Sequence, residues 1–441
     1  MSDITPSVSP EPEWAAFVAI DWADKKHCWK LLAAGSVTPE EGTLANTPEA
    51  LSMWAANLQE RFGGRPIAVC LEQSRGPLVY ALCKFPHLVL YPVHSTTAAR
   101  YRQAFFPSGS KDDPVDTTLL LELLTRHRDR LRRLNPETPE TRLLQMLVEQ
   151  RRKLVDERTR YSNQLTAWLK MYFPQVLIWI DNIDSPLGCD LLERWPSLEQ
   201  LKCVNPAKLH DFFTTHNSRS EQRIQERINA IYQAVPAVND PALLQAGPAS
   251  VQALVRILQV LNSAIADFDQ RIESAANNHP EAPLFVGLPG AGPVLRPRLI
   301  AAFGTQRERY QDAGELQNYS GIAPVTKRSG GTQSIHFRRA CPKFLRQTFH
   351  EFAGHSIQKS TWARAYYRSQ RELRKDHHAA VRALAFKWMR VLYACWRDRQ
   401  PYDEATYARS LEKRNSPLAK LTTALQWKDV AGFKKLSPKT T

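Results

Sequence analysis

Four acidic residues are the part of this sequence best suited to chemistry. Asp21 and Glu72 each end an apolar run that is typical of a buried strand. Asp113 and Asp116 lie in the stretch SKDDPVD, at the start of a predicted helix. Open α/β sheets gather reactive groups at the carboxyl ends of their strands, so all four could face one crevice. Carboxylates that close repel one another unless a cation is present, and Mg²⁺, which takes oxygen ligands and bridges phosphates, is the natural choice.

Helix capping is the competing interpretation of the same acids. Asp113 precedes Pro114 as an ordinary N-cap does, and Asp116 falls at the third helical position, where a carboxylate favours the helix dipole. Asp21 or Glu72 alone could also be a cap or half of an ion pair. The four together, with both strand contexts, favour the metal site. We expect Asp112 to be a bystander.

The charge of the chain indicates a polyanionic partner. Its 441 residues carry a formal net charge of +15, which favours nucleic acid first and an anionic membrane second. Residues 338–399 hold 15 Lys and Arg against 4 Asp and Glu, interleaved with aromatic residues. Such a pattern suits backbone neutralisation and base stacking, although amphipathic helices with an aromatic core would show the same aromatics.

Cysteine usage and hydropathy favour a cytoplasmic protein without a membrane anchor. We find no signal peptide and no apolar run long enough to span a bilayer. Seven cysteines show neither a CxxC pair nor zinc-ligand spacing, and we expect them to be reduced, mostly buried thiols. They are Cys28, Cys70, Cys83, Cys189, Cys203, Cys341 and Cys395.

The elements that must hold the acids alternate between strand and helix. Strands are expected at 16–21, 27–35, about 42–45, 67–72 and 87–94, and helices at 47–62, 77–85, 95–105 and 117–134. This order predicts an α/β domain with a mixed sheet over residues 14–134. Residues 1–13 are rich in Pro, Ser and Glu and are expected to be a disordered tail.

The remainder of the chain is predicted to be all-α. Residues 135–280 form a coiled coil of two helices, 141–168 and 249–276, around an irregular inserted module at about 173–247. A mainly helical domain then spans 281–400, and a basic tail with little periodicity spans 401–441.

Three stretches, FVAIDWADKKH, AVCLEQSRG and SKDDPVDTTLLLELL, resemble the DEDD motif of insertion-sequence transposases related to the Piv DNA invertase. In that family the amino-terminal domain is RuvC-like, with an RNase H-like fold. The resemblance implies that Asp21, Glu72, Asp113 and Asp116 bind Mg²⁺, with Mn²⁺ as a substitute. Family members usually have a non-acidic residue before the third acid, so whether Asp112 or Asp113 is the ligand stays open. The neighbouring residue Lys111 is predicted to contact nucleic acid.

A glycine motif opens the carboxy-terminal domain. In VGLPGAGPVLRPRLIAAFG (286–304), Gly290 and Gly292 have the spacing of a helix-hairpin-helix, whose backbone N–H groups bind a nucleic-acid phosphate. A plain tight turn is the alternative.

A second motif, LQNYSGIAPVTKRSGGTQSIHFRRA (316–340), resembles the carboxy-terminal domain of the same family. The resemblance assigns Ser329 as a nucleophile that forms a covalent phosphoserine link with DNA. A serine hydroxyl is weak until activated, and nearby positive charge is available from Lys327, Arg328, Arg338 and Arg339. The residues alone favour a simple turn at Ser329, and Thr326, Thr332 and Ser334 are neighbours that could be mistaken for it.

Both sites together predict a recombinase that cuts, holds, exchanges and reseals DNA without external energy. The resemblance implies donor and target DNA as substrates, a structured bridge RNA as guide, and a dimer that assembles into a synaptic tetramer in a bacterial cytoplasm. Two rivals remain. One is an RNase H-like nuclease or Holliday-junction resolvase that uses water as nucleophile, and the other is a non-catalytic nucleic-acid-binding scaffold.

Overall fold

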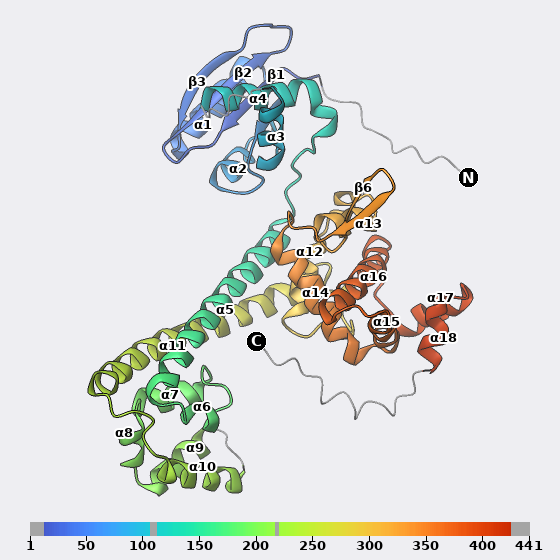
Figure 1. The fold of residues 1–441 in the computed structure, drawn as a ribbon. Helices are drawn as coiled ribbons and strands as arrows, with labels where there is room; N and C mark the ends of the chain where they lie inside the picture. Colours follow the sequence, from blue (N-terminus) through green and yellow to red (C-terminus); the bar gives the residue numbers. More distant parts are fainter. Residues whose placement is uncertain (1–12, 106–112, 217–219, 425–441) are drawn as a thin grey trace. The chain divides into compact units, whose positions relative to one another are not determined.

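A computed structural model describes residues 13–105, 113–216 and 220–424, apart from the side chains of residues 113, 114, 423 and 424 (Figure 1). The chain divides into two compact units, residues 1–136 and 137–441. Lys111, Asp112 and the predicted amino-terminal tail up to residue 12 lie outside the described residues.

The first unit is built on a five-stranded mixed sheet in the order β3-β2-β1-β4-β5. Its strands are β1 (Ala16–Asp21), β2 (Lys26–Ala33), β3 (Glu40–Ala45), β4 (Ile67–Leu71) and β5 (Leu88–Pro92). The first three strands are antiparallel neighbours, whereas β4 runs parallel to both β1 and β5. This topology confirms the predicted RNase H-like mixed sheet.

Helices cover both faces of this sheet. They are α1 (Pro48–Arg61), α2 (Pro77–Leu82), α3 (Ser95–Phe105) and α4 (Asp113–His127). Alternate strand residues point to opposite faces. Val18, Ile20 and Val69 pack in one core with α1 and α2, while Ala19 and Cys70 pack in the other with α3 and α4.

The helix α4 ends earlier than predicted. It stops at His127 instead of continuing to residue 134, and a 3₁₀ turn, η1 (Arg128–Arg130), follows. Leu131 is extended, and the Leu134 amide donates a hydrogen bond to the Leu90 carbonyl at 2.7 Å. After α4 the chain therefore returns to β5, at the edge of the sheet.

The second unit contains the predicted antiparallel pair of long helices, α5 (Pro139–Tyr172) and α11 (Pro241–Asn277). Arg151 in α5 pairs with Asp269 near the end of α11, whereas Gly247 near the start of α11 lies against the ring of Tyr172. These contacts fix the antiparallel direction, because early residues of one helix meet late residues of the other.

The inserted module is helical, so the prediction of irregular structure over 173–247 was wrong. Its helices are α6 (Val176–Trp179), α7 (Pro186–Arg194), α8 (Leu198–Lys202), α9 (Pro206–Thr215) and α10 (Glu221–Gln233). Three of the prolines that suggested irregularity, Pro186, Pro206 and Pro241, start helices instead. Ser185 and Asn205 cap α7 and α9, and each is followed by proline at a first-turn position, where its missing N–H is harmless.

The helix α11 is long and apolar enough, by length and composition, to cross a membrane, which the sequence analysis overlooked. Its residues Val251, Val255 and Leu258 are fully buried in the core shared with α5 and α7. The helix α11 also contacts the inserted module through a polar residue: the side-chain amide of Asn262 donates a hydrogen bond to the backbone carbonyl of Asp184 at 2.8 Å. We therefore assign α11 as an interior helix of this unit.

The carboxy-terminal part of the second unit is mainly helical, as predicted, with one hairpin. Its elements are η2 (Ala282–Phe285), α12 (Leu295–Phe303), η3 (Arg307–Arg309), α13 (Ala313–Tyr319), β6 (Val325–Ser329), β7 (Thr332–His336), α14 (Lys343–Lys359), α15 (Thr361–Glu372), α16 (His377–Arg397), α17 (Glu404–Lys413) and α18 (Pro417–Ala424). The last two helices lie within the segment 401–441, for which little periodicity was expected.

Three tryptophans of this part belong to its core. Trp362, Trp388 and Trp396 are at most 1 % exposed, and each indole N–H donates a hydrogen bond inside the protein. They are therefore not available as a stacking platform for bases. All seven cysteines are free, but only Cys70 and Cys189 are buried, so the expectation of mostly buried thiols was wrong.

Candidate nucleic-acid cleavage site

Asp21 and Glu72 come together at one edge of the sheet. The strands β1 and β4 are parallel neighbours, and Ile20 pairs with Leu71, so the next residue of each strand is an acid at the same level. Neighbouring strands lie about 4.8 Å apart. Burial and, secondarily, the negative charge of Glu72 raise the pKa of the Cys70 thiol to about 12. The Glu72 carboxylate therefore lies close enough to Cys70 to interact with it.

Both acids continue the face of the sheet that α4 covers. Residues 17, 19 and 21 of β1 alternate with residues that face α1, and Cys70 and Glu72 continue the same alternation after β4. The helix α4 packs across β1, β2 and β4 on this face, and the Lys30 ammonium of β2 donates to the Thr118 hydroxyl of α4 at 2.9 Å. The fold therefore directs Asp21, Glu72 and the first turn of α4 to one side of the sheet.

Asp116 is the described acid of that first turn. Its side chain is only 4 % exposed, and the Arg102 guanidinium of α3 forms an ion pair with it. The contact lacks hydrogen-bond geometry, so within the described residues the buried Oδ1 atom of Asp116 has charge compensation but no hydrogen-bond donor. Arg102 is a residue that the sequence analysis missed, although it lies in a helix that was predicted.

The side chains of Asp112 and Asp113, the other candidate ligands, are not among those that the structure describes. Asp113 begins α4, but its side chain is among those left out, and Asp112 lies in the gap before it. Among the described side chains, no three His, Cys, Asp or Glu residues lie close enough together to hold a metal ion. The structure thus brings Asp21 and Glu72 together and turns Asp116 to Arg102.

Ser329 occupies the tip of an exposed hairpin in the second unit. It ends β6 and pairs with Thr332 of β7 across the two-residue turn Gly330–Gly331. Gly330 has a φ of +56°, which other residues adopt only at a cost, and the Thr332 hydroxyl donates to the Ser329 carbonyl at 2.8 Å. The turn alone therefore explains Gly330 of the Ser-Gly-Gly run, as the competing interpretation requires.

The face of the hairpin that carries Ser329 also carries a cation and a histidine. By alternation and register, Lys327, Ser334 and His336 share this face with Ser329, whereas Arg328 points to the other face. The His336 imidazole bonds to the Ser334 hydroxyl at 2.9 Å. The Ser329 hydroxyl makes no hydrogen bond within the described residues.

The two predicted arginines that follow the hairpin differ in their surroundings. Arg338 is occupied structurally, since its Nη2 atom donates to Asn318 Oδ1 at 2.9 Å and its Nε atom to the Ala323 carbonyl at 3.3 Å. Arg339 is exposed. Arg338 thus anchors the base of the hairpin, while Arg339 keeps its charge at the surface.

The two glycines of the predicted helix-hairpin-helix also differ. Gly290 has a φ of +86°, and a Cβ atom there would lie 2.7 Å from the backbone of His355 and Ser356 in α14. Gly292, just before α12, has open space around it. Packing against α14 is therefore sufficient to explain Gly290, whereas Gly292 could approach a ligand.

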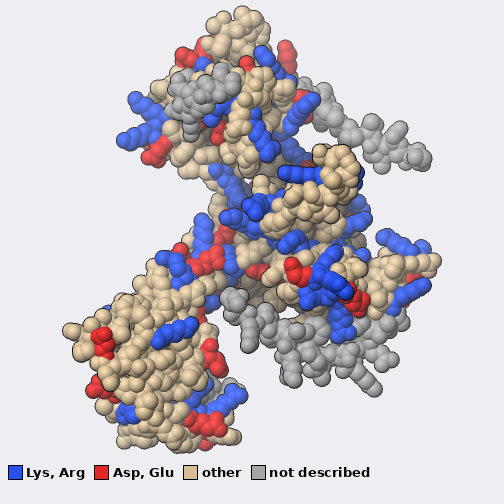
Figure 2. Space-filling view, viewed as in Figure 1, with Lys and Arg blue, Asp and Glu red and all other residues tan. Residues whose placement is uncertain are grey.

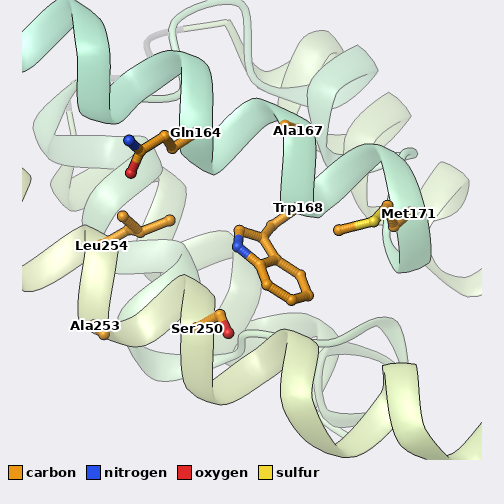
Figure 3. A pocket seen from close by; sticks show the side chains of 7 residues that line it. All are labelled: Gln164, Ala167, Trp168, Met171, Ser250, Ala253 and Leu254. Atoms are coloured by element: carbon orange, nitrogen blue, oxygen red, sulfur yellow. The ribbon is translucent and has the colours of Figure 1, made fainter.

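Lysine and arginine side chains gather over the carboxy-terminal helices of the second unit, while the module α6–α10 shows fewer of them (Figure 2). A groove of about 360 Å³ between α5 and α11 is a different kind of surface. The Trp168 indole points across it toward Ser250 and Leu254 (Figure 3). It contains no titratable side chain among its lining residues, so it offers no acid–base chemistry.

Comparison with known proteins adds two matches to sequence families. Residues 18–174, which include most of β1 and all of β4 and α4, match a family described as a transposase. Residues 282–368, which include the Ser329 hairpin, match the transposase family IS116/IS110/IS902. Together the two matches span more than half of the chain and contain both candidate sites.

Individual relatives are similar over most of their length. A mini-circle putative transposase for IS117 from Streptomyces coelicolor is 28 % identical over 89 % of this chain and 97 % of its own. An uncharacterized protein of the insertion element IS110, from the same organism, is 25 % identical over 88 % of this chain and 95 % of its own. A protein of the insertion element IS900 from Mycobacterium paratuberculosis is 26 % identical over 60 % of this chain and 66 % of its own.

Proposed function

The chain belongs to the IS110 family of transposases, and on this premise we propose that it cleaves and rejoins DNA with a carboxylate-bound Mg²⁺ and a serine nucleophile. Asp21, Glu72, Asp113 and Asp116 are the proposed ligands. Ser329 is the proposed nucleophile.

One observation carries the metal half of the proposal: the register of β1 and β4 sets Asp21 and Glu72 level on the face of the sheet that α4 covers. The chemistry of these donors fits Mg²⁺, because all are carboxylates. The buried Oδ1 atom of Asp116, which has a cation beside it but no hydrogen-bond donor, is an oxygen that a metal ion can also take. When bound, Mg²⁺ would neutralise charge on the phosphodiester and orient it.

The serine half rests on the exposure of the hairpin and its charge. The Ser329 oxygen attacks phosphorus and forms a phosphoserine ester, while the deoxyribose oxygen leaves and gains the proton that the serine loses. The number of phosphate ester bonds stays the same, so a second DNA end can reverse the step without an external energy source. The Lys327 ammonium on the same face supplies positive charge for the phosphate.

RNA guidance and assembly belong to the same proposal. The net charge of +15 suits a structured RNA as well as DNA. Exposed apolar side chains on α11, of which Val260 is 69 % and Ile257 is 38 % exposed, suit association of the chain with copies of itself. Sequencing the RNA that co-purifies with the protein tests guidance. An RNA from the non-coding end of the element supports it, and random cellular RNA contradicts it.

A nuclease that uses water is the second candidate, and one observation favours it. The hydroxyl of Ser329 has no hydrogen-bonded base within the described residues, so nothing in this structure activates it.

Matched aspartates test the metal site. Asp21→Asn removes a proposed ligand, while Asp24→Asn makes the same charge change at an exposed position three residues away. On a plasmid that carries both ends of the element, we expect Asp21→Asn to lose at least about a hundredfold in Mg²⁺-dependent cleavage, by the scale of lost electrostatic catalysis. Asp24→Asn should cleave like wild type. Normal cleavage by Asp21→Asn would remove this residue from the site.

A further inference from the structure

A small pocket at the base of the Ser329 hairpin leads to a new assignment. We propose that Arg382 of α16 binds a backbone phosphate of the DNA strand that the hairpin engages. This inference rests on the proposed function for the identity of the strand.

The pocket has a volume of about 130 Å³ and is lined by residues 321–324, residues 335–338 and Arg382. It is therefore formed by the loop after α13, the end of β7 and one helix. With water occupying about 30 Å³, it has room for a group the size of a phosphate. No acidic side chain is among its lining residues.

An exposed phenylalanine orients the arginine. Phe337 is 42 % exposed, and the guanidinium carbons of Arg382 and Arg346 lie 4.5 Å and 4.7 Å from the centre of its ring. Stacking uses the flat face of a guanidinium and leaves the N–H groups at its edge free to bind. Phe337 thus holds two cations beside the pocket without consuming their donors.

The hydrogen-bond partners of the three arginines show which one is free. Arg338 donates to Asn318 and Ala323, and Arg346 donates through Nη1 to the Arg338 carbonyl at 3.2 Å. Arg382 makes no hydrogen bond and no ion pair within the described residues, although its side chain is half-buried. A guanidinium has five N–H donors in a fork that matches phosphate oxygens, so an anionic ligand would satisfy it.

Arg382 has little negative charge near it among the described residues. Asp376 is the acid that feels Arg382, but it is exposed and its Oδ1 atom already caps α16 by accepting from the Ala379 amide at 2.6 Å. His350 and His378 lie side by side, with ring centres 5.6 Å apart. Burial lowers the pKa of His350 most, and the charges of His378 and Arg382 lower it further. An anion is the ligand that this arrangement favours.

The pocket lies along the same strand pair as the nucleophile. Thr332 stands opposite Ser329 and His336 stands opposite Val325, so the pocket end of β7 is four residues from the tip. At about 3.3 Å per residue this is roughly 13 Å. The bound phosphate would therefore lie within a few nucleotides of the one that Ser329 attacks, on the same strand.

The test compares two arginines of α16. Arg382→Ala removes the proposed contact, and Arg390→Ala removes the same charge from an exposed position of the same helix, outside the pocket. The full-length chain is titrated into a fluorescent duplex of about 40 base pairs at several salt concentrations, which report ion release. For Arg382→Ala we expect about tenfold weaker binding, by the scale of a charged hydrogen bond, and a salt slope smaller by about 0.9. Arg390→Ala should keep the wild-type slope.

Two further variants make the result specific. Phe337→Ala, which leaves Arg382 in place without its stacking partner, should weaken binding by a smaller factor. Arg382→Lys should recover part of the affinity, because it keeps the charge and loses the fork. Equal losses in Arg382→Ala and Arg390→Ala would show general charge attraction and overturn the pocket. A loss with single-stranded RNA of the same sequence, but not with DNA, would also overturn it.

Failure of this inference is distinguishable from failure of the proposed function. The adduct that wild type forms at Ser329 tests the proposed function, whereas the DNA affinity of Arg382→Ala tests this inference. If no adduct ever forms but Arg382→Ala weakens DNA binding, the serine mechanism fails and the phosphate pocket stands.

Discussion

Removal of Arg102 should make the folded state depend on Mg²⁺. Arg102→Ala leaves the Asp116 side chain, 4 % exposed, without the guanidinium that compensates its charge. Breaking a buried ion pair from one side costs about 3 kcal/mol or more. Because the Arg102 side chain is itself 20 % exposed, we take the lower end of that range. For a unit of about 136 residues this lowers the Tm by roughly 10 °C.

Magnesium should reverse part of this loss. If the ion binds the folded variant with a Kd of about 1 mM, adding about 10 mM gives RT ln 11, or roughly 1.4 kcal/mol of stabilisation. In the wild type the ion competes with Arg102 for the Asp116 carboxylate, so the gain should be smaller. The assay is calorimetric unfolding of the full chain with EDTA and with MgCl₂, in which the transition of the first unit is the one that Arg102→Ala lowers.

Two controls decide the interpretation. Arg100→Ala removes an exposed arginine from the same helix and should respond to Mg²⁺ as the wild type does. The double variant Arg102→Ala/Asp116→Asn should lose the extra magnesium effect. An equal Mg²⁺ response in wild type, Arg102→Ala and the double variant would refute the view that Asp116 is a metal ligand.

Three other changes probe the second unit. Glu281→Gln breaks a bidentate pair with Arg307, at 2.6 and 2.7 Å, and should lower the free energy of unfolding by about 3 kcal/mol in urea titrations. Gly290→Ala places a Cβ atom 2.7 Å from the α14 backbone at a φ of +86°, and calorimetry should show a loss of about 2 kcal/mol. His279 accepts from the Glu281 amide at 3.1 Å and bonds to the Thr141 hydroxyl at 2.9 Å, and burial lowers its pKa from 6.5. Its stabilisation is therefore complete above about pH 6.5 and is lost as the pH falls through the folded pKa, so His279→Gln should lose less Tm than wild type between pH 7.5 and 5.5. An equal loss in the two proteins would contradict the assignment.

The sheet could be predicted from the sequence because its signals are local. Apolar runs such as AFVAID and IAVCLE, each ending in an acid, became β1 and β4 with their acids at one edge. The register between β1 and β4, in which Ile20 pairs with Leu71, could not be predicted, because the sequence does not show how the two strands pair. The contact of Arg102 with Asp116 was unpredictable for the same reason, since it depends on how α3 packs on α4.

Errors arose where one residue type has two structural roles. Prolines in 173–247 were interpreted as breakers, but several occupy the first turn of a helix. Aromatics in 338–399 fit either base stacking or a core, and burial of Trp388 decides for the core. Arg382 was one of many basic residues in that segment, and only the position of Phe337 distinguishes it.

Trapping the protein on DNA and locating the attached residue is the most direct test of the central claim. A plasmid with both element ends is incubated with the full chain and Mg²⁺, the adduct is digested, and the nucleotide-bearing peptide is identified by mass spectrometry. We predict the modification on Ser329 and its loss in Ser329→Ala, with Ser334→Ala unaffected. Attachment to Ser334, which has His336 beside it at 2.9 Å, or cleavage without any adduct, would contradict the account.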